Sequence, residues 1–254
     1  MDIHPEAAVG FARGADDYER TRPSYPADAV AHLVSSFDIR AGATVVDVAA
    51  GTGKLTRLLL PTGARVIAVE PVAEMRSYLA STSPDAEVLE GVAEHLPVAD
   101  GTADAITVAQ AIHWFDRPAA LASFARVLRP GGGLGIINNE RLRGHGWMAE
   151  ADDLMEAYRG GTPQHYDGVW QEAFAATSLF GPLEEAEFDN PQVLSPDSFI
   201  ARLRSVSYVG ALDRVTQDAL LTSVAKLLAS HPDTAGKTEL LVPQSTRVWI
   251  CRRT

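Results

Sequence analysis

Short apolar runs alternate with amphipathic segments through the first 140 residues of the chain. The apolar runs are typical of buried strands, and they cover residues 44–48, 65–70, 86–91, 103–111 and 134–138. Apolar positions recur at helical spacing in residues 54–63, 71–83 and 117–132, where proline and glycine punctuate the pattern. This alternation indicates right-handed βαβ units, so the sequence predicts an α/β fold, with a mostly parallel sheet and helices on both faces.

The alternation stops after residue 139. Residues 147–180 and 195–230 look mainly helical, whereas residues 183–194 and 239–252 look extended. We expect the extended segments to complete a doubly wound, seven-stranded Rossmann-like sheet and the helices to cover its C-terminal edge. The expected organisation is a single domain over residues 1–254, whose parts are an N-terminal arm and helix (1–40), a ligand-binding core (41–140), a mainly helical cover with one extended segment (141–235) and a C-terminal strand (236–254).

The charge balance and the cysteine and histidine content indicate which partners and metal sites are not expected. Lys and Arg total 22 against 33 Asp and Glu, which gives a net charge of −11. Nucleic acid and anionic membranes require a basic surface, so neither is an expected partner. One cysteine, Cys251, allows no intrachain disulfide, and the histidines lack metal-ligand spacing, so we expect no metal site. The start of the sequence lacks a signal-peptide pattern and no apolar run approaches about 18 residues, so we expect a cytoplasmic protein.

The residues after the strand at 44–48 are the first candidates for chemistry, because open α/β sheets bind ligands beyond the carboxyl ends of their strands. Asp47, Ala49, Gly51 and Gly53 lie at this point. A phosphate-binding P-loop is excluded by Val48 and Leu55, which occupy its required glycine and Ser/Thr positions. The dinucleotide fingerprint lacks its third glycine, because that position is Thr56.

The charge of the acidic residues at the strand ends distinguishes between a dinucleotide and S-adenosylmethionine as the ligand. Glu70, at the end of the next strand, suits ribose hydroxyls in either a dinucleotide or an adenosine ligand. Asp47 would repel a pyrophosphate and attract a cation, which favours S-adenosylmethionine, a ligand with an ammonium and a sulfonium group. Two alternatives stay open at this point: Asp47 caps the following helix, and Glu94 is a solvated loop acid. An NAD-dependent oxidoreductase on the same sheet is an alternative of another class.

Four motifs together resemble a known family. VVDVAAGTGKLT (45–56), VIAVEP (66–71), GVAEHLPVADGTADAITVAQAIHWFD (91–116) and VLRPGGGLGIIN (127–138) are similar to the ordered motifs of class I S-adenosylmethionine-dependent methyltransferases of the type 11-like kind. The subgroup that includes trans-aconitate methyltransferases is most similar, through Arg22 to Pro26 (RPSYP) and Ala109 to Phe115 (AQAIHWF). The resemblance covers roughly residues 11–140, with a weak echo in SVSYV at residues 205–209.

The resemblance implies S-adenosylmethionine as the cofactor and assigns roles to named positions. Residues expected to contact the cofactor are Asp47, Ala49, Gly51 and Gly53 at the methionine part, Glu70 at the ribose, Ala93 and Glu94 at the adenine, Gln110 at the end of the fourth strand, and Tyr18 from the N-terminal arm. Two positions depart from the pattern. Ala49 replaces the usual first glycine of the loop, and Val92 stands where many relatives carry an acid.

The acceptor is expected beside the fourth strand, where His113 and Trp114 follow its end. His113 is the candidate catalytic residue, as a general base or as a donor to a carboxylate, with a scaffold histidine as the alternative. Arg22, Tyr25, Trp114 and Asn138 are candidate contacts for the acceptor. The implied reaction is O-methylation of a small-molecule carboxylate or hydroxyl, by a monomer or homodimer. The alternatives are N- or O-methylation of a secondary metabolite, and a cofactor-binding protein without transferase activity.

Overall fold

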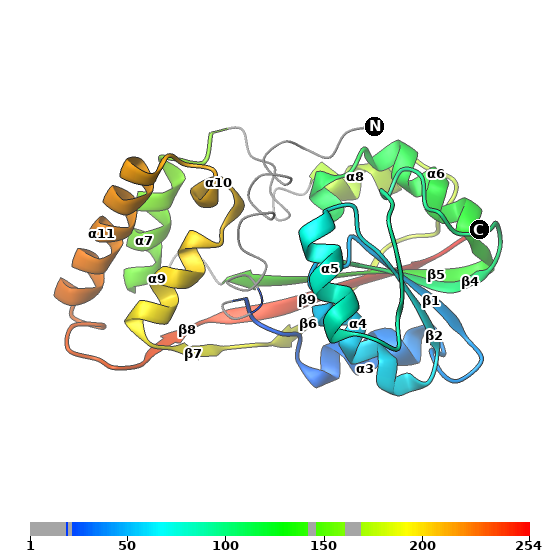
Figure 1. The fold of residues 1–254 in the computed structure, drawn as a ribbon, viewed down its shortest axis with the longest axis horizontal. Coiled ribbons are helices and arrows are strands. Elements are labelled where there is room, and N and C mark those ends of the chain that lie inside the picture. Colours follow the sequence, from blue (N-terminus) through cyan, green and yellow to red (C-terminus); the bar gives the residue numbers. More distant parts are fainter. Residues whose placement is uncertain (1–18, 20–21, 142–145, 161–168) are drawn as a thin grey trace. The chain divides into compact units, whose positions relative to one another are not determined.

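The computed structural model describes residues 19, 22–141, 146–160 and 169–254 (Figure 1). The chain divides into two compact units. Of the described residues, a helical unit comprises 19, 22–23, 141, 146–160 and 190–245, and a sheet unit comprises 24–140, 169–189 and 246–254. Residues 169–189 therefore lie in the sheet unit, whereas the sequence predicts them in the helical cover.

The predicted seven-stranded, mainly parallel sheet is confirmed. Its order is β3-β2-β1-β4-β5-β9-β6, and the pairs β1–β2, β1–β4, β2–β3 and β4–β5 are parallel. Its strands are β1 (Thr44–Val48), β2 (Arg65–Val69), β3 (Glu87–Leu89), β4 (Ala103–Ala109), β5 (Leu128–Arg141), β6 (Glu184–Asp189) and β9 (Gln244–Arg252). Because β1 lies between β2 and β4, the chain reverses its winding there, and the switch point falls at the carboxyl end of β1.

Helices cover both faces of this sheet. They are α3 (Ala27–Ser36), α4 (Lys54–Leu59), α5 (Ala73–Thr82), α6 (Arg117–Val127) and α8 (Val169–Ala175), with short 3₁₀ helices η1 (Leu60–Thr62) and η2 (Ile112–Trp114). Alternate β1 residues face opposite cores: Val46 packs in the cluster that contains α6 and α8, and Val45 packs in the cluster that contains α3 and α4. A sheet covered on both sides requires the continuous apolar runs that the sequence shows.

The junction between α6 and β5 differs from its sequence pattern. The sequence predicts a helix over residues 117–132 and a strand over 134–138, whereas α6 ends at Val127 and β5 begins at Leu128. Pro130 disfavours helical backbone at the residue before it, and Gly131 adopts a left-handed φ of +73°. The helix therefore ends before Pro130, and the strand starts earlier than its apolar core.

The helical unit contains four helices and a small ribbon among its described residues. These are α7 (Gly146–Glu156), α9 (Pro196–Arg204), α10 (Ser207–Gly210), α11 (Arg214–Ser230) and the strands β7 (Gln192–Leu194) and β8 (Leu240–Val242). Ser195 caps α9 and Asp213 caps α11, each by accepting a backbone N–H. The helices share one apolar core, in which the rings of Trp147 and Phe199 pack edge to face 5.0 Å apart.

One expectation about the extended segments is wrong. Residues 192–194 and 240–242 do not join the large sheet; β7 and β8 pair with each other as an antiparallel ribbon. Leu240 and Val242 are buried in the core of the helical unit, while Val193 and Leu241 face outward. The ribbon thus has one side to bury, and that side packs against the helices of its own unit. No helix within the described ranges is both long and apolar enough to cross a membrane.

Candidate active site

The turn between β1 and α4 is built from left-handed residues. Ala49, Gly51 and Gly53 have φ values of +53°, +58° and +85°. The Ala50 N–H donates to the Val69 carbonyl at 3.2 Å, and the Gly53 N–H donates to the Ala50 carbonyl at 2.9 Å, so the turn is held against β2 and closed on itself. Ala49 adopts this backbone with a Cβ atom, at a cost of about 1–2 kcal/mol relative to right-handed geometry.

The two glycines of this turn serve different purposes. A Cβ atom placed on Gly51 would meet no atom within 4 Å, so this position borders open space. A Cβ atom on Gly53 would lie 2.4 Å from Leu79 Cδ1 and 3.2 Å from Ser83 Oγ, at the end of α5. Gly53 is therefore required for close packing of the turn against α5, and its contact with a ligand stays a prediction. Gly51 has the space that a ligand would need.

Asp47 lies at the end of β1 and is fully buried. Thr56 Oγ1 donates to its Oδ2 at 2.6 Å, and Thr107 Oγ1 donates to its Oδ1 at 3.0 Å. Burial raises the pKa of Asp47 to about 6, although these hydrogen bonds and one from the Thr56 backbone act against the shift. The carboxylate thus joins β1 to the first turn of α4 and to β4. This geometry supports the capping interpretation; direct contact between Asp47 and a cofactor stays a prediction.

Glu70 occupies the corresponding place at the end of β2. Its Oε2 accepts the Gly51 N–H at 2.8 Å, and its Oε1 accepts the Val72 N–H at 2.9 Å. Burial raises the pKa of Glu70, and the charge of Asp47 adds to that rise, while both backbone donors and Arg76 lower it. Glu70 therefore fixes the glycine turn from the neighbouring strand. Each of its oxygens retains a second lone pair that a ribose hydroxyl can use.

Ala93 and Glu94 lie in the loop after β3. Ala93 is buried, and Glu94 Oε1 accepts the Asp116 N–H at 2.8 Å, next to the start of α6. Residues Val92 and His95 form an isolated antiparallel bridge that folds the loop back on itself. Glu94 is thus neither a free solvated acid nor an established adenine contact; its carboxylate supports the loop.

The end of β4 and the adjacent part of β5 form a second polar region. Gln110 has a left-handed φ of +57°, and its N–H donates to the Ile137 carbonyl and to Asn138 Oδ1, each at 3.1 Å. Its side-chain Nε2 donates to the Asn139 carbonyl at 3.2 Å. Asn138 is fully buried, and its Nδ2 has no hydrogen-bond partner among the described residues. A buried amide donor left unpaired costs about 1–3 kcal/mol, which a ligand acceptor atom would remove.

His113 and Trp114 lie in η2, directly after β4. Their rings are 4.9 Å apart with an interplanar angle of 43°, and both side chains are partly buried. The structure therefore brings the candidate base and its aromatic neighbour together on one short element. The two residues are adjacent in the sequence, so their proximity follows from chain connectivity and does not by itself identify a site.

The structure describes two of the three candidate site residues near the N-terminus, Arg22 and Tyr25. Tyr18 lies outside the described residues. Tyr25 is buried among core residues of the sheet unit, and its contact with an acceptor stays a prediction. Arg22 belongs to the helical unit, where its Nε donates to Ser205 Oγ at 3.1 Å and its Nη2 to the Ser205 carbonyl at 3.0 Å. Arg22 thus contacts the SVSYV segment, and its pairing with an anion stays a prediction.

Sequence reasoning missed three supporting residues: Thr56, Thr107 and Arg126. Thr107 had a detectable signal, because a hydroxyl in the otherwise apolar run of β4 requires a buried partner. Thr56 lies in the glycine-turn motif, in which the sequence pattern marks it only as the position of an absent glycine. Across the described ranges, no group of three or more His, Cys, Asp or Glu residues could hold a metal ion.

Comparison with known proteins agrees with this geometry. Residues 46–136 match the family described as a methyltransferase domain. An uncharacterized methyltransferase of Mycobacterium tuberculosis is 36% identical over 248 residues, which cover 98% of this chain and 96% of the relative. The malonyl-[acyl-carrier protein] O-methyltransferase of Pectobacterium atrosepticum is 32% identical over 126 residues, 49% of each chain. The structure of the YcgJ protein of Bacillus subtilis shares the fold, with a TM-score of 0.60, 19% identity, and coverage of 89% of this chain and 99% of that chain.

Proposed function

Because this chain belongs to the class I S-adenosylmethionine-dependent methyltransferases, we propose that it transfers the cofactor's methyl group to an oxygen of a small molecule, a carboxylate or a hydroxyl. The observation that carries the proposal is the turn after β1. Gly51 borders open space there, while its N–H is held by Glu70 from the next strand. A backbone that approaches a ligand without a side chain is what a cofactor at a switch point requires.

The residues of this turn fit S-adenosylmethionine. Asp47 and Glu70 are two buried carboxylates, and Arg76, the cation that acts on Glu70, forms its ion pair with Glu90. A cationic ligand beside them favours their ionised forms, whereas the pyrophosphate of NAD would be repelled. Glu70 would hold the ribose, and the loop around Ala93 would hold the adenine. Family membership and this charge pattern together favour a methyltransferase over the oxidoreductase alternative.

The oxygen acceptor rests on two observations. The relative from Pectobacterium atrosepticum is named an O-methyltransferase of a malonyl group, which supports an acceptor oxygen, although the match covers half of each chain. In this chain, Asn138 Nδ2 is a buried donor without a partner among the described residues, so an oxygen is the atom it would bind best.

His113 would act on the acceptor. When bound, S-adenosylmethionine supplies a methyl group that its sulfonium already activates, so the protein contributes chiefly positioning. A carboxylate acceptor is ionised at neutral pH and needs no base, and His113 would then orient it as a donor. A hydroxyl acceptor has a proton to lose, and neutral His113 would accept it.

Titration calorimetry tests the cofactor first. S-adenosylhomocysteine should bind in the micromolar range, and NAD should give no heat of binding under the same conditions. Tight NAD binding without any response to S-adenosylhomocysteine would overturn the proposal. Incubation with methyl-labelled cofactor and a panel of carboxylic acids, phenols and amines, read by mass spectrometry, then identifies the acceptor class. Methylation of amines alone would remove the oxygen assignment and leave N-methylation.

A further inference from the structure

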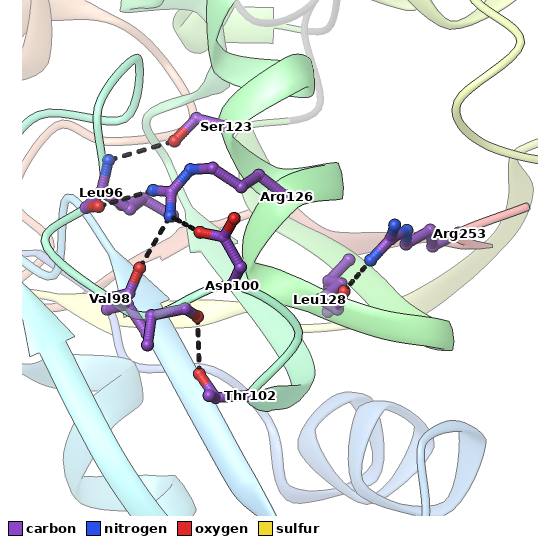
Figure 2. Close-up of polar contacts among 9 residues, drawn as sticks. Leu96, Val98, Asp100, Thr102, Ser123, Arg126, Leu128 and Arg253 are labelled. Atoms are coloured by element: carbon purple, nitrogen blue, oxygen red, sulfur yellow. Dashed lines mark hydrogen bonds and ion pairs between the residues drawn. The ribbon is translucent and has the colours of Figure 1, made fainter.

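An arginine of α6 holds the loop that follows β3 (Figure 2). Arg126 Nη2 donates to the Leu96 carbonyl at 2.7 Å, and its Nη1 donates to the Val98 carbonyl at 2.9 Å and to Asp100 Oδ1 at 2.6 Å. Ser123, one turn earlier on the same helix face, accepts the Leu96 N–H at 3.0 Å. Both backbone polar groups of Leu96 are therefore bound by α6.

The ion pair between Arg126 and Asp100 contributes less to holding the loop than the hydrogen bonds with the loop carbonyls do. The Asp100 side chain is 76% exposed, and exposed ion pairs contribute little to stability. The contacts with the carbonyls of Leu96 and Val98 are different, because one planar guanidinium fixes two points of the same loop. A lysine has a single ammonium at the end of a flexible chain and cannot reproduce that spacing.

The same helix holds the loop a second time, near its beginning. Glu94 Oε1 accepts the N–H of Asp116, the residue that caps α6. The loop is thus tied to the first residues of α6 through Glu94 and to its last turn through Arg126. The same loop contains the bridge of Val92 with His95 and the buried side chain of Leu96.

We infer that Arg126 is a positioning residue for adenine recognition: it holds the loop so that the backbone around Ala93 meets the edge of the adenine ring. This inference rests on the proposed function, which places the adenine at Ala93 and Glu94. Arg126 itself binds only loop atoms and Asp100 in its described contacts, so it acts through the loop. Its removal should therefore affect the base that is selected more than the affinity for the remainder of the cofactor.

The experiment compares two ligands that differ only in the base: S-adenosylhomocysteine and S-inosylhomocysteine, in which hypoxanthine replaces adenine. The parent protein should prefer the adenine ligand. In Arg126→Met, the affinity for S-adenosylhomocysteine should fall by about tenfold, as expected if the released loop loses about one hydrogen bond with the adenine, and the preference should fall with it. Arg126→Lys should fall between the parent and Arg126→Met.

Arg253→Met is the matched control. Arg253 also donates its guanidinium to a backbone carbonyl, that of Leu128, but this contact is at the start of β5 and not in the loop (Figure 2). Its substitution should leave the ratio of the two dissociation constants unchanged. A loss of general stability would lower the melting temperature of both variants without changing that ratio.

An unchanged ratio in Arg126→Met would overturn the inference, and this includes the case in which both ligands are weakened equally. Arg126 would then have a purely structural role. If Arg126→Met does not fold, Arg126→Lys measures the same ratio, and an unchanged ratio in that variant would also overturn the inference. A parent protein that binds neither ligand refutes the proposed function itself, and the inference with it, before any variant is compared.

Discussion

The carboxyl ends of β1 and β2 differ from the end of β4 and the adjacent part of β5 in how their buried polar groups are satisfied. Asp47 and Glu70 each have both carboxylate oxygens bound by hydroxyls or backbone amides of the surrounding turns. At the other pair of strands, Asn138 supports the left-handed backbone of Gln110 with one half of its amide and leaves Nδ2 unpaired within the described structure. The carboxylates of the first region are already oriented before a ligand binds, whereas the second region retains Asn138 Nδ2 as a donor that a ligand can use.

This difference matters for binding. A site whose carboxylates are already oriented by the fold needs little reorganisation when a cofactor enters. A buried donor without a partner gains a full hydrogen bond when a ligand oxygen arrives, and it penalises ligands that lack one. We therefore propose that the first region binds the cofactor and that the second discriminates between acceptors. Substitutions should separate the two functions accordingly.

The largest expected effect is on the acceptor side. His113→Asn should reduce turnover by roughly 10²–10⁴-fold if His113 is a general base, with little change in cofactor affinity. The parent rate should then rise with pH, because only the neutral imidazole accepts a proton. If His113 orients an ionised carboxylate, the Michaelis constant of the acceptor should increase instead, and the pH dependence should reverse.

Steady-state kinetics with calorimetry of S-adenosylhomocysteine distinguish these results. Kinetic parameters within about twofold of the parent would restrict His113 to a scaffold role. A large loss of cofactor affinity would contradict the separation of the two regions.

The two glycines of the turn provide the next test. Gly53→Ala should destabilise the fold by about 2–4 kcal/mol, because it combines left-handed strain with a clash against Leu79. Gly51→Ala has the same backbone strain but no clash, so its loss should be about 1 kcal/mol. Its main effect should instead be weaker binding of S-adenosylhomocysteine, because the new methyl group enters the open space.

Thermal unfolding and ligand titration of both variants give the comparison directly. Equal losses of stability would show that the packing at Gly53 is not limiting. Unchanged cofactor affinity in Gly51→Ala would contradict the proposal that the ligand binds beside Gly51.

The charge of Asp47 should have a smaller effect. Asp47→Asn should weaken S-adenosylhomocysteine binding by about 1.5 kcal/mol, since the ligand's ammonium loses its attraction to a buried anion. Affinity of the parent should fall as the pH drops through about 6, the value to which burial raises the pKa of Asp47, and the fall should be absent in the variant. Unchanged affinity in folded Asp47→Asn would restrict Asp47 to linking Thr56 and Thr107.

The Asp47 contribution to the stability of the ligand-free protein should increase as the pH drops, whereas the ligand affinity should fall. The folded state binds the Asp47 proton more tightly than the unfolded chain, whose carboxyl has the ordinary value of 3.8. The Asp47 contribution to stability is therefore greatest below about pH 4 and is lost as the pH rises through about 6, with a total near 3 kcal/mol. The difference in unfolding free energy between the parent and Asp47→Asn across this range measures it.

The sequence predicts the sheet and the glycine turn well because both depend on local patterns. β1 matches its apolar run from Thr44 to Val48, and the positions of Asp47 and Glu70 follow from strand ends. The ribbon of β7 and β8 was assigned to the large sheet because short extended segments do not reveal their pairing partners. The link from Thr107 to Asp47 spans 60 residues, and that from Arg126 to Leu96 spans 30, so no spacing rule could identify either contact.

The smallest expected effect concerns Ala49, at the one position of the turn where a side chain replaces the family's glycine. Ala49 has a φ of +53°, which a Cβ atom disfavours by about 1–2 kcal/mol, whereas glycine adopts it freely. Glycine also loses more conformational entropy on folding, so Ala49→Gly should stabilise the protein by about 0.5–1 kcal/mol net. Ala50→Gly is the control, because Ala50 is not left-handed and glycine there should only destabilise. Thermal unfolding should therefore move in opposite directions for these adjacent substitutions, and a melting temperature lowered in both would show that the left-handed backbone at Ala49 carries no strain.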